Sequence, residues 1–183
     1  MVAGRSTRSL GVMKRYAGFF EWFDQGRKEL GVVEELLESL NSAGASLSSP
    51  RLQRPDPPDC VCRDARGNNV AIEVTEVVCE EAARLTAQGH DVMRVWKPGE
   101  LREHVAARLS DKDSKHFNGG PFAETVVCLF TDEPMLTPPQ VQEELRAASF
   151  GPFNQVTAAY LVMSYDPGTK SYPVVPLRVS HDA

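Results

Sequence analysis

The sequence predicts a single α/β domain with a mixed central sheet flanked by helices. Segments with helical periodicity are interspersed with short apolar runs that are bounded by turn-forming residues. The chain has 183 residues and 42% hydrophobic content, which is enough for one compact domain with a substantial core, and nothing suggests a second domain. We therefore expect residues 1–183 to form one domain, with residues 1–12 disordered.

The N-terminal part of the chain carries two helical patterns. Aromatic residues recur at helical spacing between positions 16 and 23, and a second apolar stripe follows Gly31. The second stripe consists of Val33, Leu36, Leu37 and Leu40. Together these stripes predict one broken helix or two. Residues 41–58 are rich in Ser, Pro and Gly, and we expect them to form a linker.

The most informative segment is a predicted β-hairpin within residues 54–75. Asp64 opens and Gly67 closes a type I turn, in which Gly67 can adopt the left-handed conformation of a three-residue loop. Counting outward from this loop places Asp59 opposite Glu73 on one face of the hairpin. The other face is apolar and is formed by Cys60, Cys62, Val70, Ile72 and Val74.

The segments expected after the hairpin are a short helix over 80–88, a helix that begins at Pro98, a buried strand over 125–131, a helix over 138–148, and a second hairpin with strands over 155–164 and 172–179. The helix that begins at Pro98 carries Leu101, Val105 and Leu109 at four-residue spacing, which predicts one buried face.

The opposed carboxylates of the first hairpin predict a metal site. Two such groups repel each other and raise the pKa of one of them, unless a cation, a proton or a basic side chain offsets the repulsion. A divalent cation such as Mg²⁺ would do so through oxygen ligands, here from Asp59 and Glu73. Asp56 also follows a proline, but the hairpin register puts it on the opposite face, and Pro57 and Pro58 interrupt any strand between it and the site.

The order of Pro58-Asp59, a hairpin, and Glu73-Val74-Thr75 resembles the PD-(D/E)XK superfamily of restriction-endonuclease-like phosphodiesterases. The segment is also similar to uncharacterised bacterial proteins with a PDPPD…IEVTE pattern. The resemblance implies a restriction-endonuclease-like fold, Mg²⁺ or Mn²⁺ as cofactor, and hydrolysis of phosphodiesters in DNA or RNA. In the superfamily the Asp and the Glu hold the metal, and a lysine two residues after the Glu orients the attacking water. Thr75 occupies that lysine position here.

The resemblance implies two further kinds of site residue. A helical Glu before the hairpin often completes the metal site in this superfamily, and the candidate here is Glu34, with Glu29 as the other acidic residue beside the stripe. An exposed helix charge is the alternative for either residue. The missing lysine is sometimes replaced by one from a neighbouring helix, so Lys112 or Lys115 could stand in. The alternative for these lysines is a solvated basic helix end that interacts favourably with the helix dipole.

Composition narrows the classes of function. The net charge of −5 argues against a protein that coats nucleic acid electrostatically, but it is compatible with an enzyme that binds nucleic acid locally. None of the four cysteines forms a C-x-x-C pair, so we expect buried, reduced thiols and no zinc site. The sequence shows neither a signal peptide nor a membrane-length apolar run, which favours the cytoplasm and no membrane partner.

Three functional hypotheses follow. The first is a Mg²⁺- or Mn²⁺-dependent nuclease that uses Asp59 and Glu73, in which Thr75 could position water but cannot supply the charge of a lysine. The second is a nuclease-fold protein that has lost catalysis and binds nucleic acid or protein; the substitution at Thr75 and the acidic composition favour it. The third is an α/β domain whose acidic hairpin is incidental.

Overall fold

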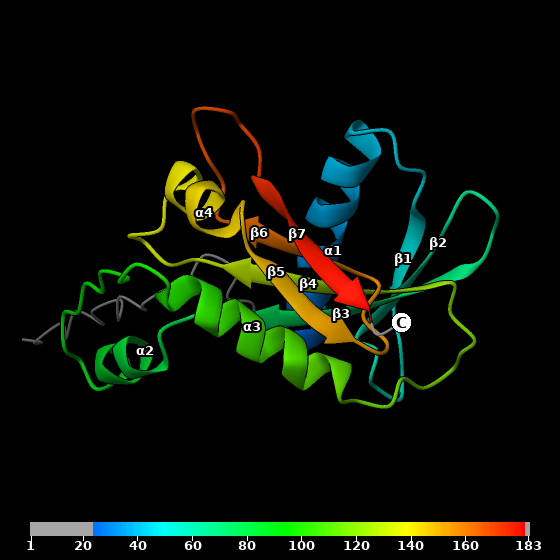
Figure 1. Ribbon diagram of the computed structural model, residues 1–183, viewed down its shortest axis with the longest axis horizontal. Helices are drawn as coiled ribbons and strands as arrows, with labels where there is room; N and C mark the ends of the chain where they lie inside the picture. Colours follow the sequence, from blue (N-terminus) through cyan, green and yellow to red (C-terminus); the bar gives the residue numbers. More distant parts are fainter. Residues whose placement is uncertain (1–23, 182–183) are drawn as a thin grey trace, which may run out of the picture.

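The computed structural model describes residues 24–181, and within them seven strands form one mixed sheet with helices packed around it (Figure 1). The elements in chain order are α1 (Gln25–Ser42), β1 (Ser48–Leu52), β2 (Cys60–Arg63), β3 (Asn69–Glu76), α2 (Glu80–Ala87), α3 (Glu100–Asp113), β4 (Glu124–Thr131), α4 (Pro138–Leu145), β5 (Ser149–Phe153), β6 (Ala158–Met163) and β7 (Val174–His181). The predicted α/β class with a mixed central sheet flanked by helices is therefore confirmed.

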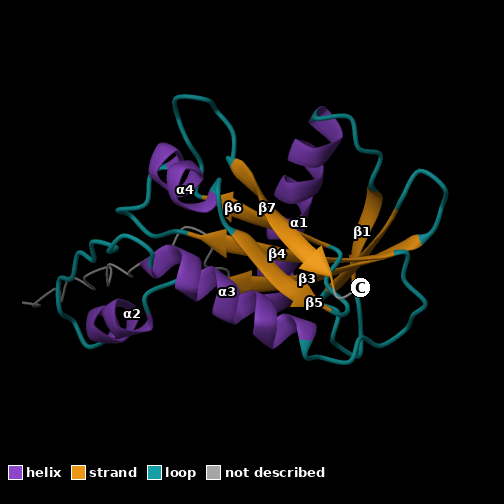
Figure 2. Cartoon of the chain, viewed as in Figure 1, coloured by secondary structure: helices purple, strands orange, loops and turns teal. Residues whose placement is uncertain are grey.

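The sheet has the strand order β1-β2-β3-β4-β6-β7-β5. Strands β1, β2 and β3 form an antiparallel meander, and β4 and β6 then add in parallel to β3. Strand β7 is antiparallel to β6, and β5 lies parallel to β7 at the far edge. Figure 2 shows these strands as one twisted layer. Strands β3, β4 and β6 thus share a direction, and α3 runs along the lower part of the sheet in the view of Figure 1.

Each face of the sheet has its own apolar core. Helix α1 covers one face, where Val33 and Leu36 contact the apolar side of the β2–β3 hairpin. Helices α3 and α4 cover the other face, where Leu101 and Val105 of α3 belong to the same apolar cluster as Val127 of β4 and Leu161 of β6. The free cysteines in the described residues are all buried, as predicted: Cys60, Cys62, Cys79 and Cys128.

Helix α1 is continuous through Gly31, so the two stripes do not reflect a break at this glycine. The helix starts after Asp24, whose Oδ1 accepts a hydrogen bond from the Arg27 N–H at 2.9 Å. The aromatic stripe between positions 16 and 23 and the segment 1–12 lie outside the described residues. Neither α1 nor any other helix of residues 24–181 is long and apolar enough to cross a membrane.

Two strands of the structure, β1 and β5, are not indicated by the sequence. The composition of residues 41–58 predicts a linker, but these residues include β1, which pairs with β2 at one edge of the sheet. Strand β5 lies at the other edge, and the predicted helix 138–148 ends at Leu145 before it. Both strands contain a proline, at Pro50 and Pro152. An edge strand tolerates proline because one row of its backbone N–H groups has no ladder partner, and the sequence pattern alone indicates a loop.

Candidate functional site

The β2–β3 hairpin has the register that the turn residues predict. The Asp64 N–H donates to the Asn68 carbonyl at 3.0 Å, and Gly67 adopts a left-handed φ of +82°. Cys60 pairs with Ile72, so that the preceding Asp59 lies opposite the following Glu73. The predicted position of Asp59 opposite Glu73 thus follows from this register, and the end of α3 reaches Glu73.

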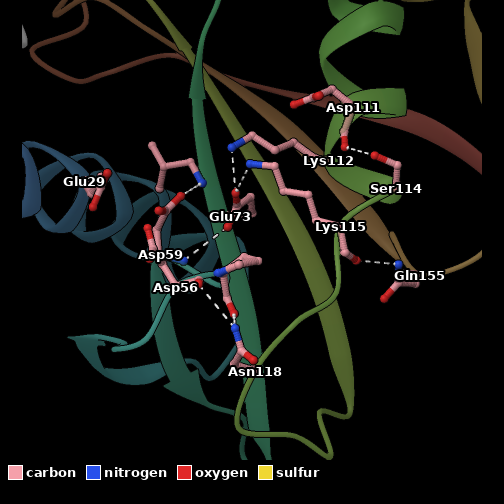
Figure 3. Close-up of polar contacts among 12 residues, drawn as sticks. Glu29, Asp56, Asp59, Glu73, Asp111, Lys112, Ser114, Lys115, Asn118 and Gln155 are labelled. Atoms are coloured by element: carbon pink, nitrogen blue, oxygen red, sulfur yellow. Dashed lines mark hydrogen bonds and ion pairs between the residues drawn. The ribbon is translucent and has the colours of Figure 1, made fainter.

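Each of the two carboxylates accepts a hydrogen bond from a backbone N–H group of the opposite strand segment. The Asp59 N–H donates to Glu73 Oε2 at 3.2 Å, and the Val74 N–H donates to Asp59 Oδ2 at 2.8 Å (Figure 3). Glu73 is 2% exposed and Asp59 is 7% exposed. Burial raises the pKa of Asp59 to about 6, and the negative charge of Glu73 contributes to the rise, whereas the hydrogen bond from Val74 opposes it. Asp59 therefore changes its charge close to neutral pH.

Two lysines at the end of α3 neutralise Glu73. Lys112 Nζ lies 2.6 Å from Glu73 Oε1, and Lys115 Nζ lies 3.1 Å from the same oxygen. Figure 3 shows both lysine side chains reaching from α3 and the residues just after it toward β3. The Lys112 side chain is 10% exposed and that of Lys115 is 37% exposed. A carboxylate as deeply buried as Glu73 requires such partners, since an unpaired charge in this position would be strongly unfavourable.

The spacing of residues along α3 explains why Lys112 reaches the sheet. Leu101, Val105 and Leu109 form the buried stripe of the helix, and Lys112 follows Leu109 at a spacing of three. Lys112 thus continues the buried face, and its ammonium group meets Glu73 where the next apolar residue would otherwise pack. The alternative of a solvated helix end does not describe Lys112, because this lysine is buried.

Burial alone would lower the pKa of Lys115. Its hydrogen bond to Glu73 and the negative charge of Glu73 outweigh this effect and raise the pKa. Lys115 is therefore held in its charged form beside the carboxylate.

A third carboxylate, that of Glu29, lies on α1 near the site. Its Oε1 accepts a hydrogen bond from Gln25 Nε2 at 2.9 Å. Its Oε2 is buried without a hydrogen-bond partner among the described residues, and Arg54 Nη2 lies 3.9 Å from it. The negative charge of Glu29 contributes to the raised pKa of Asp59. In the view of Figure 3, Asp59 lies between Glu29 and the two lysines.

Glu34, the helical Glu that the resemblance implies, is exposed on α1 and is not brought to the hairpin carboxylates. The difference follows from helix geometry. Glu29 precedes Val33 by four residues and Leu36 by seven, so it belongs to the buried stripe, whereas Glu34 directly follows Val33 and points away from it. The spacing of Glu29 from Val33 and Leu36 is therefore the sequence signal that identifies Glu29, rather than Glu34, as the buried glutamate.

The loop after α3 closes over the β1–β2 connection. The Asn118 N–H donates to the Pro57 carbonyl at 2.7 Å, and Asn118 Nδ2 donates to the carbonyls of Pro57 at 3.2 Å and Asp56 at 3.3 Å (Figure 3). Asp56 is exposed and contributes its backbone rather than its carboxylate. Thr75 is half-buried on β3, two residues after Glu73 and therefore on the same strand face.

The donor set fits a hard divalent cation. Within residues 24–181, no three His, Cys, Asp or Glu side chains are arranged as a ready-made metal cluster. The carboxylates of Asp59 and Glu73 are nevertheless close enough to interact electrostatically, and the buried Oε2 of Glu29 lacks a hydrogen bond from the described residues. Mg²⁺ is commonly bound by one or two carboxylates and completes its coordination with water and substrate phosphate. The residues present are therefore compatible with Mg²⁺ or the similar Mn²⁺ at Asp59 and Glu73.

Four of the expected site residues converge: Asp59, Glu73, Lys112 and Lys115. The sequence does not indicate the other polar residues around them, namely Asp113, Asn118 and Gln155, because their roles depend on contacts between distant loops. Comparisons of the chain with models of protein families, with curated proteins and with solved structures gave no match. The functional argument therefore depends on the chemistry of this cluster.

Proposed function

We propose that this protein is a metal-dependent phosphodiesterase that acts on nucleic acid, with a fold related to that of the PD-(D/E)XK nucleases. One observation carries the proposal: Asp59, Glu73 and the ammonium group of Lys112 meet in one buried cluster, although they come from separate elements. Two acids and a lysine are the set that the sequence resemblance implies. The order of a helix, a hairpin, further helices and then β4 also fits the order that the resemblance requires.

Asp59 and Glu73 would hold the Mg²⁺ or Mn²⁺ ion, with Glu29 as the adjacent third acid. The ion, when bound, polarises the scissile phosphate and lowers the pKa of a bound water. Asp59 binds a cation only in its ionised form, and its pKa of about 6 means that protons compete with the metal in mildly acidic solution. Glu73, which is hydrogen-bonded on both oxygens, keeps a fixed position beside Asp59.

Lys112 and Lys115 would supply the positive charge that Thr75 lacks. An ammonium group has three N–H donors, so Lys112 can donate to Glu73 and still offer a donor to a phosphate oxygen or a water molecule. Its charge lies beside the site at which negative charge develops during phosphoryl transfer. The hydroxyl group of Thr75, on the same strand face as Glu73, could orient a water molecule but adds no charge.

A second candidate function is a nuclease-fold module that binds nucleic acid or protein without cleaving it. The observation that favours it is the neutralisation of Glu73 by two lysines, because a carboxylate that is already paired has less need of a metal ion. The two candidate functions differ in metal binding and in cleavage, and each of these two properties can be measured separately.

The test is cleavage of plasmid DNA, single-stranded DNA and RNA in Mn²⁺ or Mg²⁺, with EDTA as the metal-free control. Wild-type protein should cleave at least one of these substrates, and Asp59→Asn and Glu73→Gln should each abolish the cleavage. Glu34→Gln removes an exposed carboxylate of α1 and should leave it unchanged. An inert wild-type protein that still binds nucleic acid would favour the binding module, and an inert protein that binds neither metal nor nucleic acid would refute both candidates.

A further inference from the structure

We propose that Asp113 and Gln155 are positioning residues for the two lysines. They hold the C-terminal end of α3 against the connection between β5 and β6, and this contact places Lys112 and Lys115 on Glu73. The consequence for catalysis depends on the proposed function, whereas the consequence for the lysine side chains does not.

Asp113 is fixed by three consecutive backbone groups. Its carboxylate accepts hydrogen bonds from the N–H groups of Asn154 at 3.0 Å, Gln155 at 2.8 Å and Val156 at 3.0 Å. The residue is buried, and burial alone would raise its pKa, but these hydrogen bonds outweigh that effect and lower the pKa. Asp113 is therefore an ionised side chain that joins the last residue of α3 to the segment before β6.

Gln155 makes the reciprocal contact. Its Nε2 donates to the carbonyl of Asp113 at 2.7 Å and to the carbonyl of Lys115 at 2.7 Å. The carbonyl groups in the last turn of a helix lack intrahelical partners, and one side-chain amide satisfies two carbonyls at this helix end. Figure 3 shows Gln155 beside the backbone of Lys115. The two contacted residues flank Ser114, the C-cap of α3.

These contacts determine where the lysines lie relative to Glu73. Lys112 immediately precedes Asp113, and Lys115 lies beyond the end of the helix, so the position of its backbone depends on contacts outside α3. Val156 is completely buried, and the adjacent Thr157 donates its N–H to the Thr125 carbonyl of β4 at 2.8 Å. Strand β4 in turn pairs with β3 at Glu73. The contacts of Asp113 and Gln155, which together form a clamp, therefore anchor the end of α3 to the same sheet that carries the carboxylate.

The directional character of the clamp distinguishes it from ordinary packing. Apolar contacts along α3 hold the helix on the sheet, but they restrict its rotation and axial position less than hydrogen bonds do. Three N–H groups on one carboxylate and two carbonyls on one amide define a single arrangement of the helix end. Without them, we expect α3 to stay folded while its last turn moves and the lysines leave Glu73.

The test is pulsed labelling of lysine amines with acetic anhydride, read by mass spectrometry at each lysine. Asp113→Asn and Gln155→Leu should each raise the labelling rates of Lys112 and Lys115 roughly tenfold, the scale expected for losing a hydrogen bond to a charged group. Lys28 is the internal reference, because it lies on α1, pairs with Glu76 at 3.0 Å, and should keep its rate.

Asp64→Asn is the matched control variant. The Asp64 carboxylate also accepts backbone N–H groups, from Arg66 and Asn68 at 2.8 Å each, but it does so in the hairpin loop. This variant should leave the labelling of Lys112 and Lys115 unchanged. Gln155 is only half-buried, so Gln155→Leu decides the question if Asp113→Asn fails to fold.

Unchanged rates at Lys112 and Lys115 in the folded variants would overturn the positioning role, and so would an equal rise at Lys28, which indicates general loosening. If the wild-type protein cleaves nucleic acid, both variants should lower kcat and leave KM unchanged, because the lysines act at the reacting phosphate. A fall in binding with unchanged kcat would contradict that role. An inert wild-type protein would refute the proposed function alone, since the labelling result still decides the positioning role.

Discussion

Lys112 Nζ contacts Glu73 Oε1 at 2.6 Å, although the two residues are 39 positions apart in the chain. The contact crosses from α3 to β3 and joins two side chains that are both largely removed from solvent. Desolvation of the two charges offsets much of their attraction, so this pair contributes little net stability compared with apolar residues of the same size. Removing one partner has a different effect, because it leaves the other charge buried.

The first prediction concerns this pair. Lys112→Met keeps the apolar stem but leaves Glu73 with Lys115 alone, and we expect the free energy of unfolding to fall by about 3 kcal/mol, the lower end of the cost of breaking a buried ion pair. Lys115→Met should cost less, about 1 kcal/mol or below, because Lys115 is more exposed. Urea denaturation measures both values. Equal losses for the two variants would show that the burial of Lys112 does not matter.

The second prediction follows from the pKa of Asp59, which rises from 3.8 to about 6 on folding. The folded protein binds this proton more tightly than the unfolded chain, so the stabilising contribution is complete below pH 3.8 and is lost as the pH rises through about 6. The full loss is about 3 kcal/mol. Asp59→Asn retains an acceptor for the Val74 N–H and cannot ionise.

The variant should therefore gain stability relative to wild type as the pH rises from about 4 through about 6, in EDTA. Asp64→Asn should change the pH dependence of stability in the opposite direction. A hydrogen bond from Asn68 is the main reason that the pKa of Asp64 is lowered, so its contribution is present at neutral pH and is lost in acid. A pH-independent difference between wild type and Asp59→Asn in urea denaturation would contradict the raised pKa.

The hairpin shows how much of the site follows from local sequence. Asp64 and Gly67 define the turn, and the two-residue alternation of side chains then places Asp59 and Glu73 on one face without reference to the rest of the chain. The apolar stripe of α3 is equally visible in the sequence, and the position of Lys112 at the end of that stripe is encoded by its spacing from Leu109.

The remaining features depend on tertiary contacts. Strand β1 has Ser and Pro where a strand usually has β-branched residues, and it forms because β2 offers an edge to pair with. Asp113 and Gln155 lie on opposite sides of β4 in the sequence and meet only when α3 packs on the sheet. No local pattern indicates such a contact. The motif match points to Glu34, which is exposed, whereas the helical spacing of the apolar stripe of α1 points to Glu29.

The third prediction concerns metal binding. An ion that binds only the folded protein raises Tm, and a hundredfold excess over Kd corresponds to about 2.7 kcal/mol, or roughly 5–10 °C for a domain of this size. Glu73→Gln should remove most of this rise, and Glu29→Gln should remove part of it. Glu34→Gln is the control and should show the full rise. Thermal unfolding in millimolar Mg²⁺ or Mn²⁺ gives the answer, and no rise in wild type would favour the metal-free binding module.

The last prediction uses Thr75 to separate a decayed site from a rearranged one. If the lysines of α3 supply the missing charge, wild-type protein should already cleave DNA or RNA in Mn²⁺. Lys112→Met or Lys115→Met should then lower kcat by roughly two to three orders of magnitude, the scale for one electrostatic contact in a transition state. Thr75→Lys should add little, because the charge is already present.

If Thr75 instead marks the loss of catalysis, wild-type protein should be inert and Thr75→Lys should create or increase cleavage, since the new ammonium group lies on the strand face that carries Glu73. Thr75→Met introduces a side chain about as long as lysine but without its charge, and this variant is the matched control. The two outcomes cannot both occur, because they require opposite results for wild type. Inactivity of wild type, Thr75→Lys and both lysine variants on DNA and RNA alike would reject the nuclease proposal, and the buried ion pairs at Glu73 would then have a purely structural role.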